Sequence, residues 1–216
     1  MTMTQAFTVE SAMLRKAAAA ARSIVSTSKA IPILNNVRLD AGDGQLRLLT
    51  TDQDCWAEIT MPAVTSAPVS TTVAAALLDD IARNAPSGAQ VEISITDAGA
   101  VAKAGRARFR LPTLSPDMFP PMNDHGLVAQ VRIWVSDLLT AIGAVAHIKA
   151  DDNKPHLQGV LFRPVGGGIE FATFDGKRLS RATADAQVDP GFEALTMPAP
   201  VVAKLRTILE GAGDEI

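Results

Sequence analysis

In two stretches of the chain the periodicity of the hydrophobic residues changes at a serine. Residues 7–25 and 131–149 each begin with apolar and polar positions in alternation, which is typical of a half-buried strand. Each then carries apolar residues three or four positions apart, and this spacing predicts an amphipathic helix. Ser11 and Ser136 stand at the change, and we predict that they are the N-caps of the two helices.

Alternation around glycine turns dominates two longer stretches. Residues 33–61 and 156–184 each contain three short alternating runs, which predict three antiparallel strands. Asp43-Gly44 separates the first two runs in one stretch, and the Gly166–Gly168 run does so in the other. Such residues supply the positive φ angles of hairpin turns, so we expect a hairpin at each of these places.

The two halves of the chain repeat each other. A strand followed by a helix with an apolar stripe is predicted again at residues 70–89 and 194–213, so three kinds of segment recur in one order. Equivalent segments lie roughly 123 to 126 residues apart, with Asp52 opposite Asp175, and this regular spacing indicates an internal duplication. Two more strands are predicted within residues 90–98 and 100–114, and the second copy is expected to lack their counterparts.

A segment rich in Pro, Asp and Asn, residues 111–129, separates the two copies. Its composition predicts an extended connector. We expect four of its apolar residues to pack against a neighbouring element: Leu114, Met118, Phe119 and Met122. We therefore predict two domains, a complete one at residues 1–122 and a partial one at residues 123–216.

The composition is that of a folded globular protein. Hydrophobic residues make up 47% of the 216 positions and charged residues 20%, which provides a core and argues against disorder. Cys55 is the only cysteine, so no disulfide can form within the chain, and a cytoplasmic location is expected. The sequence shows neither a signal peptide nor an apolar run of 18 residues, so we expect no membrane association.

Residues that could carry catalysis or hold a metal do not cluster in the sequence. The three histidines, His125, His147 and His156, lack the spacing of metal-ligand pairs. Gly176-Lys177 resembles the end of a phosphate-binding loop, but such a loop needs a glycine five residues earlier and a Ser or Thr directly after the lysine. We therefore predict no catalytic site, no metal site and no cofactor.

Basic residues recur on all four predicted helices, although the net charge of the chain is −3. Net charge neither predicts nor excludes nucleic-acid binding, because the distribution of charge matters more than its sum. Two interpretations stay open: solvated outer helix faces, or one positive surface for a phosphate backbone, built from equivalent helices of both copies. The residues concerned are Arg15, Lys16, Arg22, Arg83, His147, Lys149, Lys204 and Arg206.

Four segments together resemble the bacterial β sliding clamp family, the processivity subunits of DNA polymerase III. They are KAIPILNNVRL, GRARFRLPTLSPDMFP, LQGVLFRP and FATFDGKRLS, and the resemblance covers all 216 residues in the right order. It implies an α+β DNA-clamp fold, in which each domain packs two helices on antiparallel sheets. It also implies a protomer of three such domains, of which this chain holds the first, part of the second and none of the third.

The resemblance implies two kinds of binding residue. Clamps encircle duplex DNA without sequence preference, and the residues expected to contact DNA here are Arg15, Arg22, Lys29, Arg83, Lys149, Lys204 and Arg206. A shallow pocket in the second domain binds linear motifs of the polymerase III catalytic subunit and the clamp loader. Its expected residues here are Leu157, Phe174, Asp175, Gly176, Lys177, Arg178 and Leu179.

The expected function is that of a sliding clamp subunit, which has no catalytic site and serves a nucleotidyltransferase as an accessory subunit. In the complete family protein two protomers join head to tail into a ring, and the 216-residue chain alone is expected not to close one. One alternative is a shortened clamp relative that forms no ring and regulates by binding partners. The other is a small-molecule enzyme of unrelated mechanism.

Overall fold

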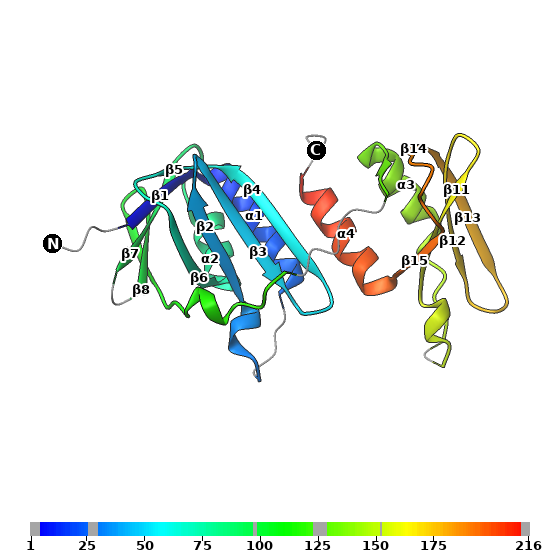
Figure 1. Cartoon of the computed structure of the whole chain (residues 1–216), viewed down its shortest axis with the longest axis horizontal. Helices are drawn as coiled ribbons and strands as arrows, with labels where there is room; N and C mark the ends of the chain where they lie inside the picture. Colours follow the sequence, from blue (N-terminus) through cyan, green and yellow to red (C-terminus); the bar gives the residue numbers. More distant parts are fainter. Residues whose placement is uncertain (1–4, 26–29, 97–98, 123–128, 152, 213–216) are drawn as a thin grey trace. The chain divides into compact units, whose positions relative to one another are not determined.

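The computed structural model of the chain describes residues 5–25, 30–96, 99–122, 129–151 and 153–212 (Figure 1). The chain divides into two compact units, unit 1 (Met1–Met122) and unit 2 (Asn123–Ile216). Both units combine helices with antiparallel sheets, which confirms the predicted α+β fold class. No helix among the described residues is long and apolar enough to cross a membrane.

Unit 1 contains two antiparallel sheets and two helices that pack against each other. The helices are α1 (Ser11–Ile24) and α2 (Ala75–Asn84), and they lie against the sheets in Figure 1. One sheet has the strand order β5 (Val64–Thr65), β1 (Gln5–Glu10), β7 (Gln90–Thr96), β8 (Gly99–Ala104) and β9 (Ala107–Leu111). The other has the order β4 (Trp56–Pro62), β3 (Gln45–Thr51), β2 (Asn36–Gly42) and β6 (Val69–Ala74). The main core of buried side chains joins helices and sheets, because each helix buries one apolar stripe.

Unit 2 contains a four-stranded sheet, a two-stranded sheet and two helices among its described residues. The larger sheet has the order β13 (Leu179–Asp185), β12 (Gly168–Phe174), β11 (Gly159–Val165) and β15 (Leu195–Pro198). The smaller sheet pairs β10 (Val131–Arg132) with β14 (Gln187–Val188). The helices are α3 (Val135–Val145) and α4 (Ala199–Ala212). The core is centred on Phe162 and Phe171, whose rings meet edge to face with centroids 4.9 Å apart.

The strand register of the two units repeats with the offset seen in the sequence. Leu39 pairs with Leu48 between β2 and β3, and Phe162 pairs with Phe171, 123 residues later, between β11 and β12. The pairs between β3 and β4 recur with the same offset between β12 and β13. Any residue of one four-stranded sheet therefore has an identifiable structural counterpart in the other.

A buried hydrogen bond is repeated as well. Thr50 of β3 donates to the carbonyl of Ala21 near the end of α1, at 3.4 Å. Thr173 of β12, its counterpart, donates to the carbonyl of Val145 at the end of α3, at 2.7 Å. Each of these carbonyls also accepts a backbone N–H, from Val25 and from Ile148, so each threonine adds a second bond that ties its strand to the end of a helix.

The hairpin at Asp43-Gly44 is confirmed, but both predicted N-caps are wrong. Asp43 and Gly44 have φ angles of 51° and 77°, as the tight turn requires. α1 starts one residue earlier than expected and α3 two residues earlier, so the N-cap residues are Glu10 and Trp134. The hydroxyl of Ser11 instead donates to the carbonyl of Pro86 at 3.0 Å, so a tertiary contact replaces the cap.

The first part of the connector folds back onto unit 1. Phe119 is 5% exposed and meets the ring of Trp56 edge to face, with centroids 6.2 Å apart. Leu114 packs against the same small apolar cluster. The predicted packing is thus confirmed for Leu114 and Phe119, and it is wrong for Met118 and Met122, whose side chains are exposed.

Candidate nucleic-acid and peptide interfaces

Two of the predicted DNA-binding residues meet between α1 and α2. The apolar stripe of α1 faces the core, which leaves Arg15 exposed on the opposite side. Nη2 of Arg15 donates to the carbonyl of Arg83, at the end of α2, at 3.0 Å. Both side chains line an open hollow of about 550 Å³ together with Ala19 and Asp79. This hollow is a basic site that a phosphate could approach from solvent.

The charge of Arg83 is partly neutralised by its own helix. Asp79, which is 4% exposed, forms an ion pair with the Arg83 guanidinium, and Asp80 lies 3.6 Å from the same group. Oδ1 of Asp79 has no hydrogen-bond partner among the described residues. Arg83 therefore presents less net positive charge to an approaching phosphate than Arg15 does.

Unit 2 brings together another two of the predicted DNA-binding residues. Lys149 follows α3, Arg206 lies on α4, and both line a hollow of about 520 Å³. The hollow also contains Leu157 and apolar residues of the core such as Val202. Arg206 is held at the rim by an ion pair with Glu210, one turn later on α4, at 3.2 Å. Unit 1 thus gathers basic side chains from its two helices, and unit 2 gathers one from α4 and one from the segment after α3.

The other three predicted DNA-binding residues line neither of these hollows. Arg22 lies in the last turn of α1, where the helix dipole favours a cation, and Lys204 is half-buried on α4. Lys29 lies outside the residues that the structure describes. Across the described parts of the chain, no group of three or more His, Cys, Asp or Glu side chains could hold a metal ion.

The Asp-Gly-Lys-Arg sequence forms the turn between β12 and β13. Oδ1 of Asp175 accepts the backbone N–H groups of Lys177 and Arg178, both at 2.8 Å, and Oδ2 accepts Nε of Arg178 at 3.0 Å. These bonds, from the Arg178 and Lys177 amides first, favour the ionised form and lower the pKa of Asp175 to about 2. Gly176 has a φ of 97°, which a residue with a side chain rarely adopts. The Gly-Lys-Arg triplet is therefore a carboxylate-closed turn that projects two cations.

Unit 1 contains the same turn without the glycine. Oδ1 of Asp52 accepts the amides of Asp54 and Cys55 at 3.2 and 2.7 Å. Gln53 stands where Gly176 does in unit 2, with a φ of 82°. A left-handed conformation costs a residue with a Cβ roughly 1–2 kcal/mol. The turn in unit 1 is thus strained at a place where unit 2 is relaxed.

We expect the substitution Gln53→Gly to stabilise unit 1 by about 0.5–1 kcal/mol, because relief of the left-handed strain outweighs the added freedom of the unfolded chain. The mirror substitution Gly176→Gln should destabilise unit 2 by at least ~1 kcal/mol, since its Cβ would also approach Nζ of Lys154. Urea unfolding of both variants measures the two changes. A loss of stability in Gln53→Gly would contradict the assignment of strain.

The predicted peptide pocket is only partly assembled in unit 2. Phe174 and Leu179 pair at the ends of β12 and β13, beside the turn, and both are exposed. Leu157, in the 3-10 turn Pro155–Leu157, instead lines the hollow that holds Lys149 and Arg206. None of the other six predicted pocket residues lines that hollow. The turn and the apolar pair beside it form an exposed apolar and basic patch.

An ion network that the sequence did not predict lies on the outer face of the unit 2 sheet. Glu170 of β12 is 1% exposed, and its carboxylate accepts hydrogen bonds from Arg163 of β11, at 2.5 Å, and from the guanidinium of Arg181 of β13. The bond from Arg181 is the main reason that the pKa of Glu170 lies below its usual value, in spite of burial. Arg163, Glu170 and Arg181 are called the unit 2 triad below.

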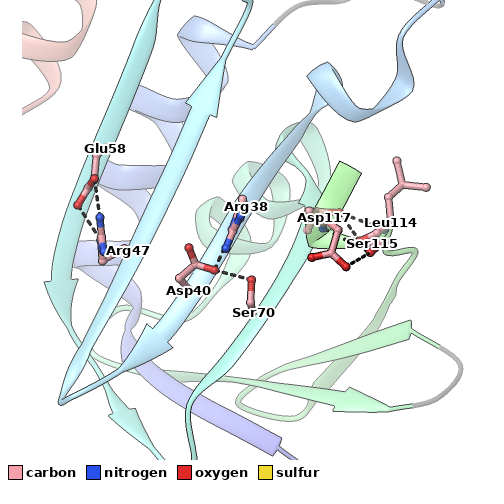
Figure 2. A network of polar contacts seen from close by, with 9 residues as sticks. Arg38, Asp40, Arg47, Glu58, Ser70, Leu114, Ser115 and Asp117 are labelled. Carbon is pink, nitrogen blue, oxygen red and sulfur yellow. Dashed lines mark hydrogen bonds and ion pairs between the residues drawn. The ribbon is translucent and has the colours of Figure 1, made fainter. Parts of the chain in front are cut away.

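The counterparts of the unit 2 triad in unit 1 carry the opposite charges. They are Asp40, Arg47 and Glu58, 123 residues earlier, on β2, β3 and β4 (Figure 2). Arg47 donates to both carboxylate oxygens of Glu58, at 2.7 and 2.8 Å, and pairs directly with Asp40 in the strand register. All three signs are inverted between the units. The sequence contained this signal, because the repeat offset applied to charged positions alone reveals it.

Comparison with known proteins gives a consistent result. Residues 5–123 match the family described as "DNA polymerase III beta subunit, N-terminal domain". The chain is 30% identical to the beta sliding clamp of Caulobacter vibrioides over 223 residues, which is 97% of this chain and 58% of that protein. It is 27% identical to the beta sliding clamp of Escherichia coli, again over 97% of this chain and 58% of the relative.

Solved structures of sliding clamps share the fold. The crystal structure of the Caulobacter crescentus beta sliding clamp superposes with a TM-score of 0.84 at 29% identity, over 98% of this chain and 58% of that one. A DNA polymerase sliding clamp from Pseudomonas aeruginosa gives a TM-score of 0.82 at 26% identity, over 95% and 56%. The chain thus has the sliding-clamp fold and spans a little over half the length of these relatives.

Proposed function

The chain belongs to the DNA polymerase III beta subunit family, and on this premise we propose that units 1 and 2 act as the first and second domains of a DNA sliding clamp. Such a clamp encircles duplex DNA without reading its sequence and tethers DNA polymerase III during replication. The observation that carries the proposal is that each unit gathers basic side chains at or beside its helices, Arg15 with Arg83 and Lys149 with Arg206. Basic groups gathered in this way suit a phosphate backbone.

The proposal includes the partners of a clamp. The complete ring closes head to tail with a second protomer, in the cytoplasm, and the turn Asp175–Arg178 of unit 2 engages linear motifs of the polymerase catalytic subunit and the clamp loader. The clamp itself performs no catalysis and assists a nucleotidyltransferase. A second candidate function, a partner-binding regulator that forms no ring, is favoured by the exposed pair Phe174 and Leu179.

We expect the chain to bind duplex DNA weakly, with affinity that falls steeply as salt rises, because the contacts are to phosphates. Arg15→Gln and Lys149→Gln should each reduce the slope of log K against log[salt] by about 0.9. Fluorescence anisotropy with two duplexes of unrelated sequence, titrated at several salt concentrations, measures affinity and slope.

Arg47→Gln is the matched control for this experiment, since it removes the same charge from the outer sheet face. Its slope should equal that of the unchanged chain. Affinities that differ between the two duplexes at equal salt, or an equal loss of slope in Arg47→Gln, would show that the helix surfaces are not the phosphate-binding site.

A further inference from the structure

A carboxylate is buried beside one of the two arginines that line the unit 1 hollow. Asp79 lies on the core-facing side of α2 and is 4% exposed, while the side chain of Arg83, one turn later, is 60% exposed. Oδ2 of Asp79 accepts a hydrogen bond from Nη2 of Arg83, and Oδ1 has no hydrogen-bond partner among the described residues. A buried carboxylate with one unpaired oxygen is costly, and an exposed arginine gains little from an ion pair. Stability alone therefore does not account for Asp79.

The two arginines of the hollow are held in different ways. Nη2 of Arg15 donates to the carbonyl of Arg83, which lies in the last turn of α2. A carbonyl at a helix end carries only a partial negative charge, so Arg15 keeps most of its own charge. The guanidinium of Arg83 instead faces two full negative charges, because Asp79 is bonded to it and the carboxylate of Asp80 lies 3.6 Å away. Arg15 is thus a ready contact for a phosphate, and Arg83 is a masked one.

The masking carboxylate has no counterpart in unit 2. The strand that precedes α2 and the strand that precedes α4 pair with β2 and β11 in the same register, so the two helices correspond with an offset of 124. Ala203 therefore stands in the place of Asp79, and Thr207 stands in the place of Arg83. Ala203 lines the basic hollow of unit 2, and none of the described residues that line this hollow is acidic. A buried carboxylate beside a phosphate-facing arginine is thus a feature of unit 1 and not of the repeated fold.

We infer that Asp79 is a positioning residue of the DNA surface: it holds and masks Arg83, and so keeps the contact of unit 1 with a phosphate backbone weak. The inference rests on the proposed function, and it names the residue that limits the strength of that contact. A basic side chain that neutralises a phosphate releases counterions from DNA, which steepens the salt dependence of binding. Arg83 releases few while it is paired with Asp79, because its counter-charge is already present and is fixed to the protein. A clamp that moves along duplex DNA needs contacts that break easily, and a fixed counter-charge gives this property to an arginine.

Asp79→Asn removes the charge and keeps the shape of the side chain, so it should unmask Arg83. In fluorescence anisotropy with one duplex at several salt concentrations, the slope of log K against log[salt] should steepen by about 0.9, the value for one more phosphate contact. The affinity for the duplex should rise about tenfold at roughly 50 mM salt and about threefold at roughly 200 mM. Arg83→Gln should change the slope of the unchanged chain far less than Arg15→Gln does, and it should abolish the gain when it is combined with Asp79→Asn.

Glu92→Gln is the matched control, because it removes the same charge from an ion pair, with Lys103, on the solvent side of β7. Its slope should equal that of the unchanged chain. Asp80→Asn should give a smaller gain in the same direction as Asp79→Asn, since Asp80 is exposed and lies farther from the guanidinium. Circular dichroism checks the fold of each variant, and a loss of folding would lower the affinity, which is the opposite of the expected change.

An Asp79→Asn chain that binds duplex DNA as the unchanged chain does would overturn the inference and leave the proposed function intact. A gain that persists in full when Arg83 is also replaced would overturn it too, because the carboxylate would then act on DNA directly and not through the arginine. Equal effects of Arg83→Gln and Arg15→Gln in the unchanged chain would contradict the masking whether or not Asp79→Asn folds. If neither the unchanged chain nor any variant binds duplex DNA, the proposed function fails together with the inference.

Discussion

Hydrogen exchange is expected to protect the amides of residues 7–112 at least about 100-fold better than those of residues 131–212. Among the described residues, the main core cluster of unit 1 holds 27 buried side chains and that of unit 2 holds eight, so unit 2 has far less apolar burial to oppose unfolding. A domain's whole margin is about 5–15 kcal/mol, and a difference of roughly 3 kcal/mol already changes protection 100-fold.

The helices show where the difference arises. In unit 1, α2 buries five residues against its neighbours, whereas on α4 only Val202 is buried among the residues whose side chains are described. Exchange should therefore be fastest in α4 and slower in α3, which buries three residues. The measurement needs several protein concentrations, because association would protect exposed edges. Equal protection of both units in the monomer would show that unit 2 closes its core by other means.

Much of the fold follows from local pattern. Alternation and helical spacing place most of the strands and all four helices, since burial on one face demands these periods. The duplication was visible because the offset of 123 is carried by turns such as Asp52 and Asp175, whose carboxylates close the same turn in both units. The geometry of such a turn depends on a few neighbouring residues, so it can be predicted from the sequence.

Features that depend on tertiary contacts were less predictable. Nothing local to Ser11 indicates that its hydroxyl would meet Pro86, 75 positions away. Leu114 and Phe119 of the connector pack in the apolar cluster with Trp56, whereas Met118 is exposed. The hydrophobic pattern of the sequence does not distinguish these three residues. Leu157 faces a hollow rather than the turn with which it was grouped. Each outcome depends on which surface the folded chain presents.

The inverted triads show what duplication conserves. The energy of an ion pair depends on the product of its two charges, so reversal of every sign leaves each attraction in place. In unit 2 the triad ties three strands by ion pairs, whereas in unit 1 Arg47 pairs with Glu58 of the next strand and Asp40 pairs with Arg38 of its own strand. Selection for stability alone does not fix which residue of an ion pair is positive, whereas a charged ligand on one face of the sheet would fix it. The unit 2 triad is thus net positive, whereas in unit 1 Arg38 pairs with Asp40 and offsets the net negative charge of the counterpart residues.

The central carboxylate of unit 2 is buried and that of unit 1 is not, so substitution of Glu170 should lower the free energy of unfolding more than substitution of Glu58. Glu170→Gln is expected to destabilise unit 2 by about 2 kcal/mol, because a 1% exposed carboxylate loses charge-assisted bonds from two arginines. Glu58→Gln, the matched change in unit 1, should cost at most about 1 kcal/mol, since Arg47 and Glu58 are solvated. Urea unfolding that resolves the two units measures both.

The pH dependence gives the sharper test. The folded pKa of Glu170 is lowered, chiefly by the bond from Arg181, so its stabilisation is complete above the unfolded pKa of about 4.3 and is lost as pH falls through the lower folded value. The difference in unfolding free energy between the unchanged chain and Glu170→Gln should therefore be constant from about pH 7 to 5 and shrink below about 4. A difference that persists undiminished at pH 2 would mean that packing, and not the ionised carboxylate, holds the three strands together.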